Sequence, residues 1–98
     1  MRLTPEQRQT IHREVTSFLG TTAAVFIYGS RLDDEARGGD VDLLVRTVEP
    51  VEAFDQARLQ SKIEQALQLP VDLLFVTEGM ETTHFKRMIC AQARPLAA

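Results

Sequence analysis

Two aspartates at the start of an apolar run are the feature that most limits how this chain can fold. Asp40 and Asp42 stand two residues apart, and apolar residues continue the run to Val45. In a strand, side chains two residues apart lie on the same face, so the two carboxylates share one surface. Like charges held together resist burial unless a cation lies between them. We therefore expect a strand from about Asp40 to Arg46 that carries a cation site.

A third aspartate is placed by a repeat of the same pattern. The sequence Val-Asp-Leu-Leu at 41–44 recurs at 71–74, and the residues between them, 51–69, have the apolar spacing of a helix. A helix between two strands is the usual crossover connection of parallel strands. If the two strands are neighbours at a spacing of about 4.8 Å, Asp72 lies beside Asp42. Three carboxylates on one patch are oxygen ligands that suit Mg²⁺ or Mn²⁺.

The turn before this strand has the residues of an anion site. Gly29 lets a phosphate approach the backbone, and Ser30 adds a hydroxyl donor. Arg31 adds a cation that can make a charge-assisted contact with the same anion. Two cations about 3.5 to 4 Å apart in such a site can activate a hydroxyl and stabilise a leaving pyrophosphate.

The remaining pattern predicts an α+β fold of two layers, with a small mixed sheet covered by helices. A first helix begins at the Thr4 cap, because Gln7 completes a capping box, and it ends at Gly20, because glycine commonly terminates a helix. The short apolar run 23–28 predicts a strand covered on both faces. The other expected elements are the strand 71–76, a helix from 82 or 83 to 93, and an edge piece at 94–96. The apolar side chains expected to face inward on the two later helices are Phe54, Leu59, Ile63, Ala66, Leu67, Phe85, Met88 and Ile89.

Composition narrows the class of protein. A chain of 98 residues predicts a single domain over 1–98, and a net charge of -3 argues against a nucleic-acid partner. No apolar run approaches the roughly 20 residues of a membrane span, and the start lacks a signal peptide, so we expect a cytoplasmic protein. Cys90, the single cysteine, is expected to be a small buried thiol, and His12 and His84 are expected on helix surfaces.

At these residues the sequence resembles the nucleotidyltransferase superfamily that includes DNA polymerase beta, and most closely its minimal single-domain members. The resemblance covers the order of elements in 23–76 and the closing helix and tail in 85–96. It implies the polymerase beta-like fold and a metal-dependent transfer of a nucleoside monophosphate, with AMP from ATP as the expected case. It also implies the residue roles. The expected catalytic and metal residues are Asp40, Asp42 and Asp72, which would hold two Mg²⁺ ions, and the expected nucleotide-binding residues are Gly29, Ser30 and Arg31.

The resemblance also implies a partner. Minimal members commonly act with a small helical protein of the HEPN type, and some are antitoxins that attach AMP to a tyrosine of that toxin. Gly39, where many relatives have serine, and the acidic loop 32–35 depart from the family pattern and affect how the triphosphate is held. The alternative reading is a nucleotide-binding subunit without catalysis. The sequence leaves open the acceptor, the base preference, self-association, and whether Asp72 binds metal or acts as a base.

Overall fold

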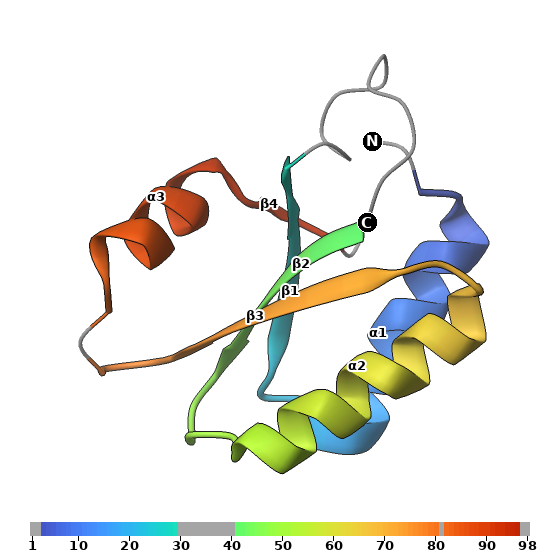
Figure 1. The fold of residues 1–98 in the computed structure, drawn as a ribbon, viewed down its shortest axis with the longest axis horizontal. Helices are drawn as coiled ribbons and strands as arrows, with labels where there is room; N and C mark the ends of the chain where they lie inside the picture. The colour runs from blue at the N-terminus through green and yellow to red at the C-terminus, as the bar shows by residue number, and fades with distance from the viewer. Residues whose placement is uncertain (1–2, 30–40, 81, 97–98) are drawn as a thin grey trace.

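The computed structural model describes residues 3–29, 41–80 and 82–96, and these form three helices and one mixed four-stranded sheet (Figure 1). This is the α+β architecture that the sequence predicts. The strand order is β3-β2-β1-β4. The elements along the chain are α1 (Pro5–Leu19), β1 (Ala24–Tyr28), β2 (Val41–Thr47), α2 (Ala53–Leu67), β3 (Val71–Thr77), α3 (His84–Gln92) and β4 (Arg94–Pro95).

The first helix has the ends that its sequence predicts. The Thr4 hydroxyl accepts from the Gln7 backbone N–H at 3.1 Å, and the Gln7 side chain accepts from the Thr4 N–H at 2.9 Å. This reciprocal capping box satisfies two of the amides that an α-helix leaves without an internal partner. At the other end Gly20 takes a φ of 89°, a left-handed value that glycine adopts at little cost. The helix therefore begins and ends where local chemistry dictates.

The sheet joins one antiparallel pair to one parallel pair. β1 runs antiparallel to β2, and β2 runs parallel to β3 through the crossover helix α2. Pro70 limits how far α2 can continue, because the residue before a proline disfavours the helical conformation. The short edge strand β4 pairs with β1, and Leu96 N–H donates to the Val25 carbonyl at 3.1 Å. The predicted crossover and the predicted edge piece are both confirmed.

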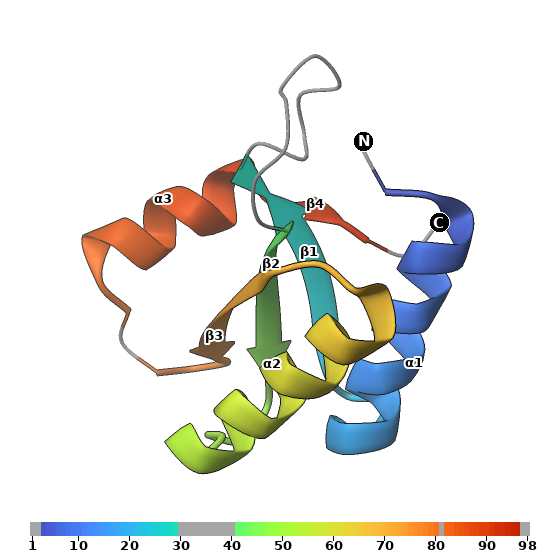
Figure 2. The same cartoon turned by 45° about the vertical axis from the view of Figure 1, so that its right-hand side comes forward.

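The main core lies between one face of the sheet and the helices α1 and α2, which cover that face together (Figures 1 and 2). Alternate residues of each strand point into it, as the pleat of a strand requires. The buried apolar side chains of this core are Leu3, Ile11, Val15, Val25, Ile27, Val41, Leu43, Val45, Leu59, Ile63, Val71, Phe75 and Leu96. One face of the sheet therefore rests on a well-packed apolar layer.

The opposite face of the sheet is covered only in part, by α3 (Figures 1 and 2). This corrects the expectation that β1 is buried on both faces, because Phe26 and Tyr28 keep part of their surface in solvent. It also corrects two inward positions of α3. Ile89 is buried, whereas Phe85 and Met88 are 61% and 51% exposed. Helical spacing indicates which residues share a face but does not show that a second layer covers it.

Three further expectations about burial are wrong. Phe54 on α2 is 72% exposed and Ala66 is also exposed, whereas Leu59 and Ile63 of the same helix are fully buried. Cys90 is an exposed thiol. In contrast, His12 and His84 lie exposed on α1 and α3, as predicted. Across the described ranges, no helix combines the length and the apolar character that crossing a membrane would require.

Candidate functional site

Three polar side chains form a row across the sheet at the end where β2 and β3 begin. Asp42 of β2 pairs in register with Asp72 of the parallel strand β3, and with Tyr28 of the antiparallel strand β1. Residues in register on neighbouring strands lie about 5 Å apart and their side chains leave the same face. This is the face opposite the core, since Val41 and Leu43 on either side of Asp42 point into the core. The sheet therefore gathers two carboxylates and one phenol on its less covered face.

Hydrogen bonds at the start of β3 fix this register. The Val41 N–H donates to the Pro70 carbonyl at 3.0 Å, which joins the first residue of β2 to the residue before β3. The Val71 N–H donates to the Glu64 carboxylate at 2.8 Å, so α2 holds the same point from its last turn. Asp72 is the next residue. The backbone directly before Asp72 is therefore bonded to both β2 and α2, whereas Asp72 itself is exposed to solvent.

Gly29 makes room for the Asp42 carboxylate. It lies directly after Tyr28 with a φ of 75°, a left-handed value that residues with a Cβ seldom adopt. A Cβ at this position would overlap Asp42 Oδ2 and would come within 3.2 Å of Asp42 Cγ and 3.4 Å of Asp42 Cβ. The close approach of the backbone to this carboxylate is therefore open only to glycine.

The two carboxylates of the row affect the pKa of Tyr28. Partial burial, and then the negative charges of Asp42 and Asp72, raise the pKa of the Tyr28 hydroxyl above its ordinary value of 10.0. Two anions raise the pKa of a neighbouring phenol because they disfavour a third negative charge. The phenol thus stays protonated and can donate a hydrogen bond beside the carboxylates at every pH below about 10.

The structure brings together part of the predicted site. Gly29, Asp42 and Asp72 lie at one end of the sheet, as the sequence predicts. Ser30, Arg31 and Asp40 lie outside the described residues, and so does the acidic loop 32–35. Within the described ranges no group of three or more His, Cys, Asp or Glu side chains could hold a metal ion, so any three-carboxylate site would include a residue outside them. The roles of all six residues stay predictions.

Sequence reasoning missed Tyr28, which it treated only as the end of an apolar strand. Its place beside Asp42 depends on the antiparallel register of β1 and β2, which relates two separate segments of the chain. The one available signal was chemical. An apolar strand that ends in the only tyrosine of the chain, immediately before the Gly-Ser turn, carries a hydroxyl to the candidate site.

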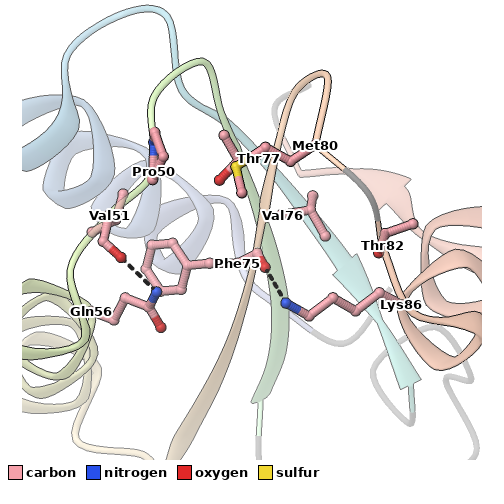
Figure 3. Close-up of a pocket in the computed structure, with 9 residues that line it drawn as sticks. All are labelled: Pro50, Val51, Gln56, Phe75, Val76, Thr77, Met80, Thr82 and Lys86. Atoms are coloured by element: carbon pink, nitrogen blue, oxygen red, sulfur yellow. Dashed lines mark hydrogen bonds between the residues drawn. The ribbon is translucent and has the colours of Figure 1, made fainter.

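A separate pocket of about 160 Å³ lies at the other end of β3 (Figure 3). Two hydrogen bonds join residues that line this pocket. Lys86 of α3 donates to the Phe75 carbonyl at 3.0 Å, and the Gln56 side chain donates to the Val51 carbonyl at 2.9 Å. None of the described residues that line the pocket carries a carboxylate. Val76 lies four positions after Asp72 in the same strand, which corresponds to about 13 Å. The carboxylate row and this pocket are therefore distinct places on the molecule.

Comparison with known proteins agrees with this geometry. Residues 9–96 match the family model described as a nucleotidyltransferase domain. A sequence comparison with curated proteins finds no match. A solved structure assigned as a minimal nucleotidyltransferase is 28% identical with a TM-score of 0.69, and the alignment covers 92% of this chain and 89% of that one. The match to the family therefore includes almost the whole chain.

Two solved toxin–antitoxin structures share the fold. A chain of a toxin–antitoxin structure with AMP-PNP is 19% identical with a TM-score of 0.77, and the alignment covers 92% of this chain and 72% of that one. A chain from the complex of tri-AMPylated Shewanella oneidensis HEPN toxin with MNT antitoxin is 17% identical with a TM-score of 0.72, covering 94% and 70%. At these identities the likeness shows the fold alone. With its family match, its mixed sheet and its row of carboxylates, the chain belongs to the nucleotidyltransferase domain family and has the polymerase beta-like fold.

Proposed function

We propose that this chain, acting as one minimal domain over 1–98, transfers AMP from ATP to a hydroxyl group of a partner protein in a reaction that requires Mg²⁺. The observation that carries the proposal is the register that sets Asp42 beside Asp72 on the open face of the sheet. Both residues are also the ones that the Asp-x-Asp pattern and its echo single out in the sequence.

The donor chemistry of the site fits Mg²⁺. At the spacing of neighbouring strands, about 5 Å, two carboxylates would repel each other by roughly 1 to 3 kcal/mol at an effective dielectric constant of 80 to 20. A hard divalent cation removes this repulsion and takes carboxylate oxygens together with water and substrate phosphates. Asp42 and Asp72 would hold it, with Asp40 as the third carboxylate that the sequence supplies. Mn²⁺, which takes similar ligands, is the expected substitute.

The reaction is a displacement at phosphorus. The acceptor oxygen forms a bond to the α-phosphorus, the bond from phosphorus to the bridging oxygen breaks so that pyrophosphate leaves, and the hydroxyl proton passes to a carboxylate of the site or to water. When bound, Mg²⁺ supplies charge neutralisation at the phosphates and a lower pKa for the attacking hydroxyl. Asp42 is half-buried in a central strand, whereas Asp72 is exposed and faces the solvent from which an acceptor arrives. Asp72 is therefore placed to hold the cation next to the acceptor or to take its proton.

The chain's other residues bind and orient the nucleotide. We assign Gly29 to the phosphates on the basis of the family pattern; the Asp42 carboxylate fills the space that a Cβ at Gly29 would take, so the two residues lie in direct contact. We assign Ser30 and Arg31 to the same phosphates on the basis of the family pattern. Tyr28 keeps its proton and can donate a hydrogen bond to a phosphate oxygen beside the two carboxylates. These contacts position the α-phosphorus, which is the main task of a protein in phosphoryl transfer.

The acceptor is proposed from the structural neighbours. A toxin–antitoxin chain with AMP-PNP and a chain from a complex that contains an AMPylated HEPN toxin share this fold. We therefore propose a helical HEPN-type protein as the partner, a tyrosine of it as the acceptor, and an antitoxin role for this chain. ATP as the donor rests on the same neighbours.

The test is transfer of label from α-labelled ATP to the HEPN-type protein of the source organism, with and without Mg²⁺. Wild-type chain should label the partner only with Mg²⁺. Replacing either carboxylate, by Asp42→Asn or Asp72→Asn, should lower the rate at least about 100-fold, since a lost metal ligand costs about 3 kcal/mol of transition-state stabilisation. Asp55→Asn on α2 is the matched control, because it removes one carboxylate of an exposed ion pair with Arg58 on the other side of the sheet.

A second readout separates binding from catalysis. Tyr28 is the only tyrosine and the chain has no tryptophan, so ultraviolet-excited fluorescence of the chain reports on the row itself. Mg²⁺ with ATP should change this signal in wild type and not in Asp42→Asn. A fluorescence change without transfer to the partner would favour the nucleotide-binding subunit. Equal transfer by wild type and Asp42→Asn would contradict the enzyme assignment.

A further inference from the structure

The outer surface of α3 has no part in the proposed chemistry. Phe85 and Met88 are 61% and 51% exposed, and they lie three residues apart, so they form one apolar stripe on the helix. We call the exposed side chains Phe85 and Met88 the α3 surface; Arg87, the residue before Met88, is exposed at its border. Contiguous exposed apolar side chains are a feature of protein contact surfaces.

The α3 surface lies on the same side of the sheet as the carboxylates. α1 and α2 cover one face, and α3 lies over the other (Figures 1 and 2). Leu44 on that face is only 3% exposed and Ile89 of α3 only 8%, and neither belongs to the main core. These two residues show that the inner side of α3 is used for packing. Its outer side remains available for another molecule.

The end of α3 is held next to the candidate site. After α3, the chain enters β4, where Arg94 pairs in register with Ile27 of β1. Ile27 precedes Tyr28, the first residue of the polar row. A protein bound along α3 would therefore border the row, which is where its hydroxyl must arrive.

The positive charge of residues 82–96 favours an acidic partner. Residues 82–96 contain Lys86, Arg87 and Arg94 and no acidic residue, in a chain whose net charge is -3, so the rest of the chain carries -6. A second copy bound through the same surface would set like charges against each other, because a two-fold interface brings identical patches together. An acidic partner gains from the same charges.

We propose that the α3 surface docks the acceptor protein through an apolar patch with acidic residues around it. This inference rests on the proposed function, because it adds the place where the acceptor binds. The exposed apolar side chains supply the contact area, and Arg87 supplies orientation and a faster encounter. Docking here would hold the acceptor at the Tyr28 end of the row, from which Asp72 lies two strands away.

The test measures the affinity of the chain for the HEPN-type protein of the source organism by calorimetry, together with KM and kcat for label transfer to it. The double variant Phe85→Ser/Met88→Ser should raise Kd and KM at least about tenfold and leave kcat at saturating partner within about twofold, as expected for a binding hot spot remote from the reacting atoms. Phe54→Ser is the matched control, because Phe54 is even more exposed, at 72%, but lies on α2.

A charge-reversed pair supplies an independent arm. Arg87→Glu should slow association and reduce its dependence on salt, whereas Arg13→Glu, an exposed position on α1, should not. Unchanged affinity in both α3 variants, or no binding of the partner by wild type, would overturn the docking surface. Failure of transfer by wild type with the partner bound would count against the proposed function and leave docking intact. Sedimentation showing that the double variant instead dissociates a dimer would assign the surface to a second copy.

Discussion

Replacing Gly29 by alanine tests whether the carboxylate row depends on the backbone beside it. The left-handed conformation of Gly29, with φ of 75°, costs alanine about 1 to 2 kcal/mol. The new Cβ would also overlap Asp42 Oδ2 and press on Cγ at 3.2 Å, closer than the 3.5 to 4.0 Å of a normal carbon contact. The Asp42 side chain must therefore turn away, at a cost of about 0.5 to 1.5 kcal/mol.

Gly79→Ala is the matched control for this change. Gly79 has a φ of 80°, so alanine suffers the same backbone strain there, but a Cβ would meet nothing within 4 Å. Both variants should lose roughly 1 to 2 kcal/mol of unfolding free energy in urea, with Gly29→Ala losing about 1 kcal/mol more. Only Gly29→Ala should lose Mg²⁺-dependent label transfer, at least about 100-fold, because it moves a proposed metal ligand. Equal activity of the two variants would refute the reasoning.

Three further changes test the row and the layer beneath it. Asp72→Asn should raise the unfolding free energy without Mg²⁺ by about 1 kcal/mol, because it removes repulsion from Asp42, while abolishing transfer; thermal unfolding that shows a loss would contradict this. The absorbance of Tyr28 should titrate with a midpoint above 10.0 in wild type, and the midpoint should be lower in Asp42→Asn than in wild type. Because the unfolded chain loses the phenol proton at a lower pH than the folded chain, the free energy of unfolding should fall as pH rises past 10. A wild-type midpoint at or below 10 would contradict the electrostatics. Leu59→Ala, at a fully buried position of α2, should cost about 2 to 5 kcal/mol by urea unfolding and leave the Mg²⁺ requirement of the remaining folded protein unchanged.

The order of the elements was readable from the sequence because local signals mark it. The capping box at Thr4 and the prolines around α2 act within a few residues, so they survive whatever the rest of the chain does. The echo of Val-Asp-Leu-Leu gave the pairing of Asp42 with Asp72, because identical patterns on two strands joined by a crossover helix favour the in-register arrangement. The adjacency of these two residues was thus predictable before any coordinates.

The covering of each face was not predictable in the same way. Phe85 and Met88 have the spacing of a buried face, but whether a layer lies over them depends on where α3 packs, which is a tertiary property. The place of Tyr28 required the register of the antiparallel pair, and the Gly29 contact required the path of the backbone at a single residue. These features depend on relations between distant segments, and no local pattern contains them.

Because β2 and β3 both contain the sequence Val-Asp-Leu-Leu, the carboxylate row forms only when these two strands pair in the correct register. A slip of one residue between β2 and β3 would turn Asp72 toward the apolar layer and expose Val71, so the misfolded sheet would lose packing and chemistry together. A slip of two would preserve the packing pattern but would move one carboxylate along the strand by about 6.6 Å, too far for both to reach a common cation. Mg²⁺ would therefore bind and stabilise only the sheet in its correct register, and it would favour this register over the shifted ones.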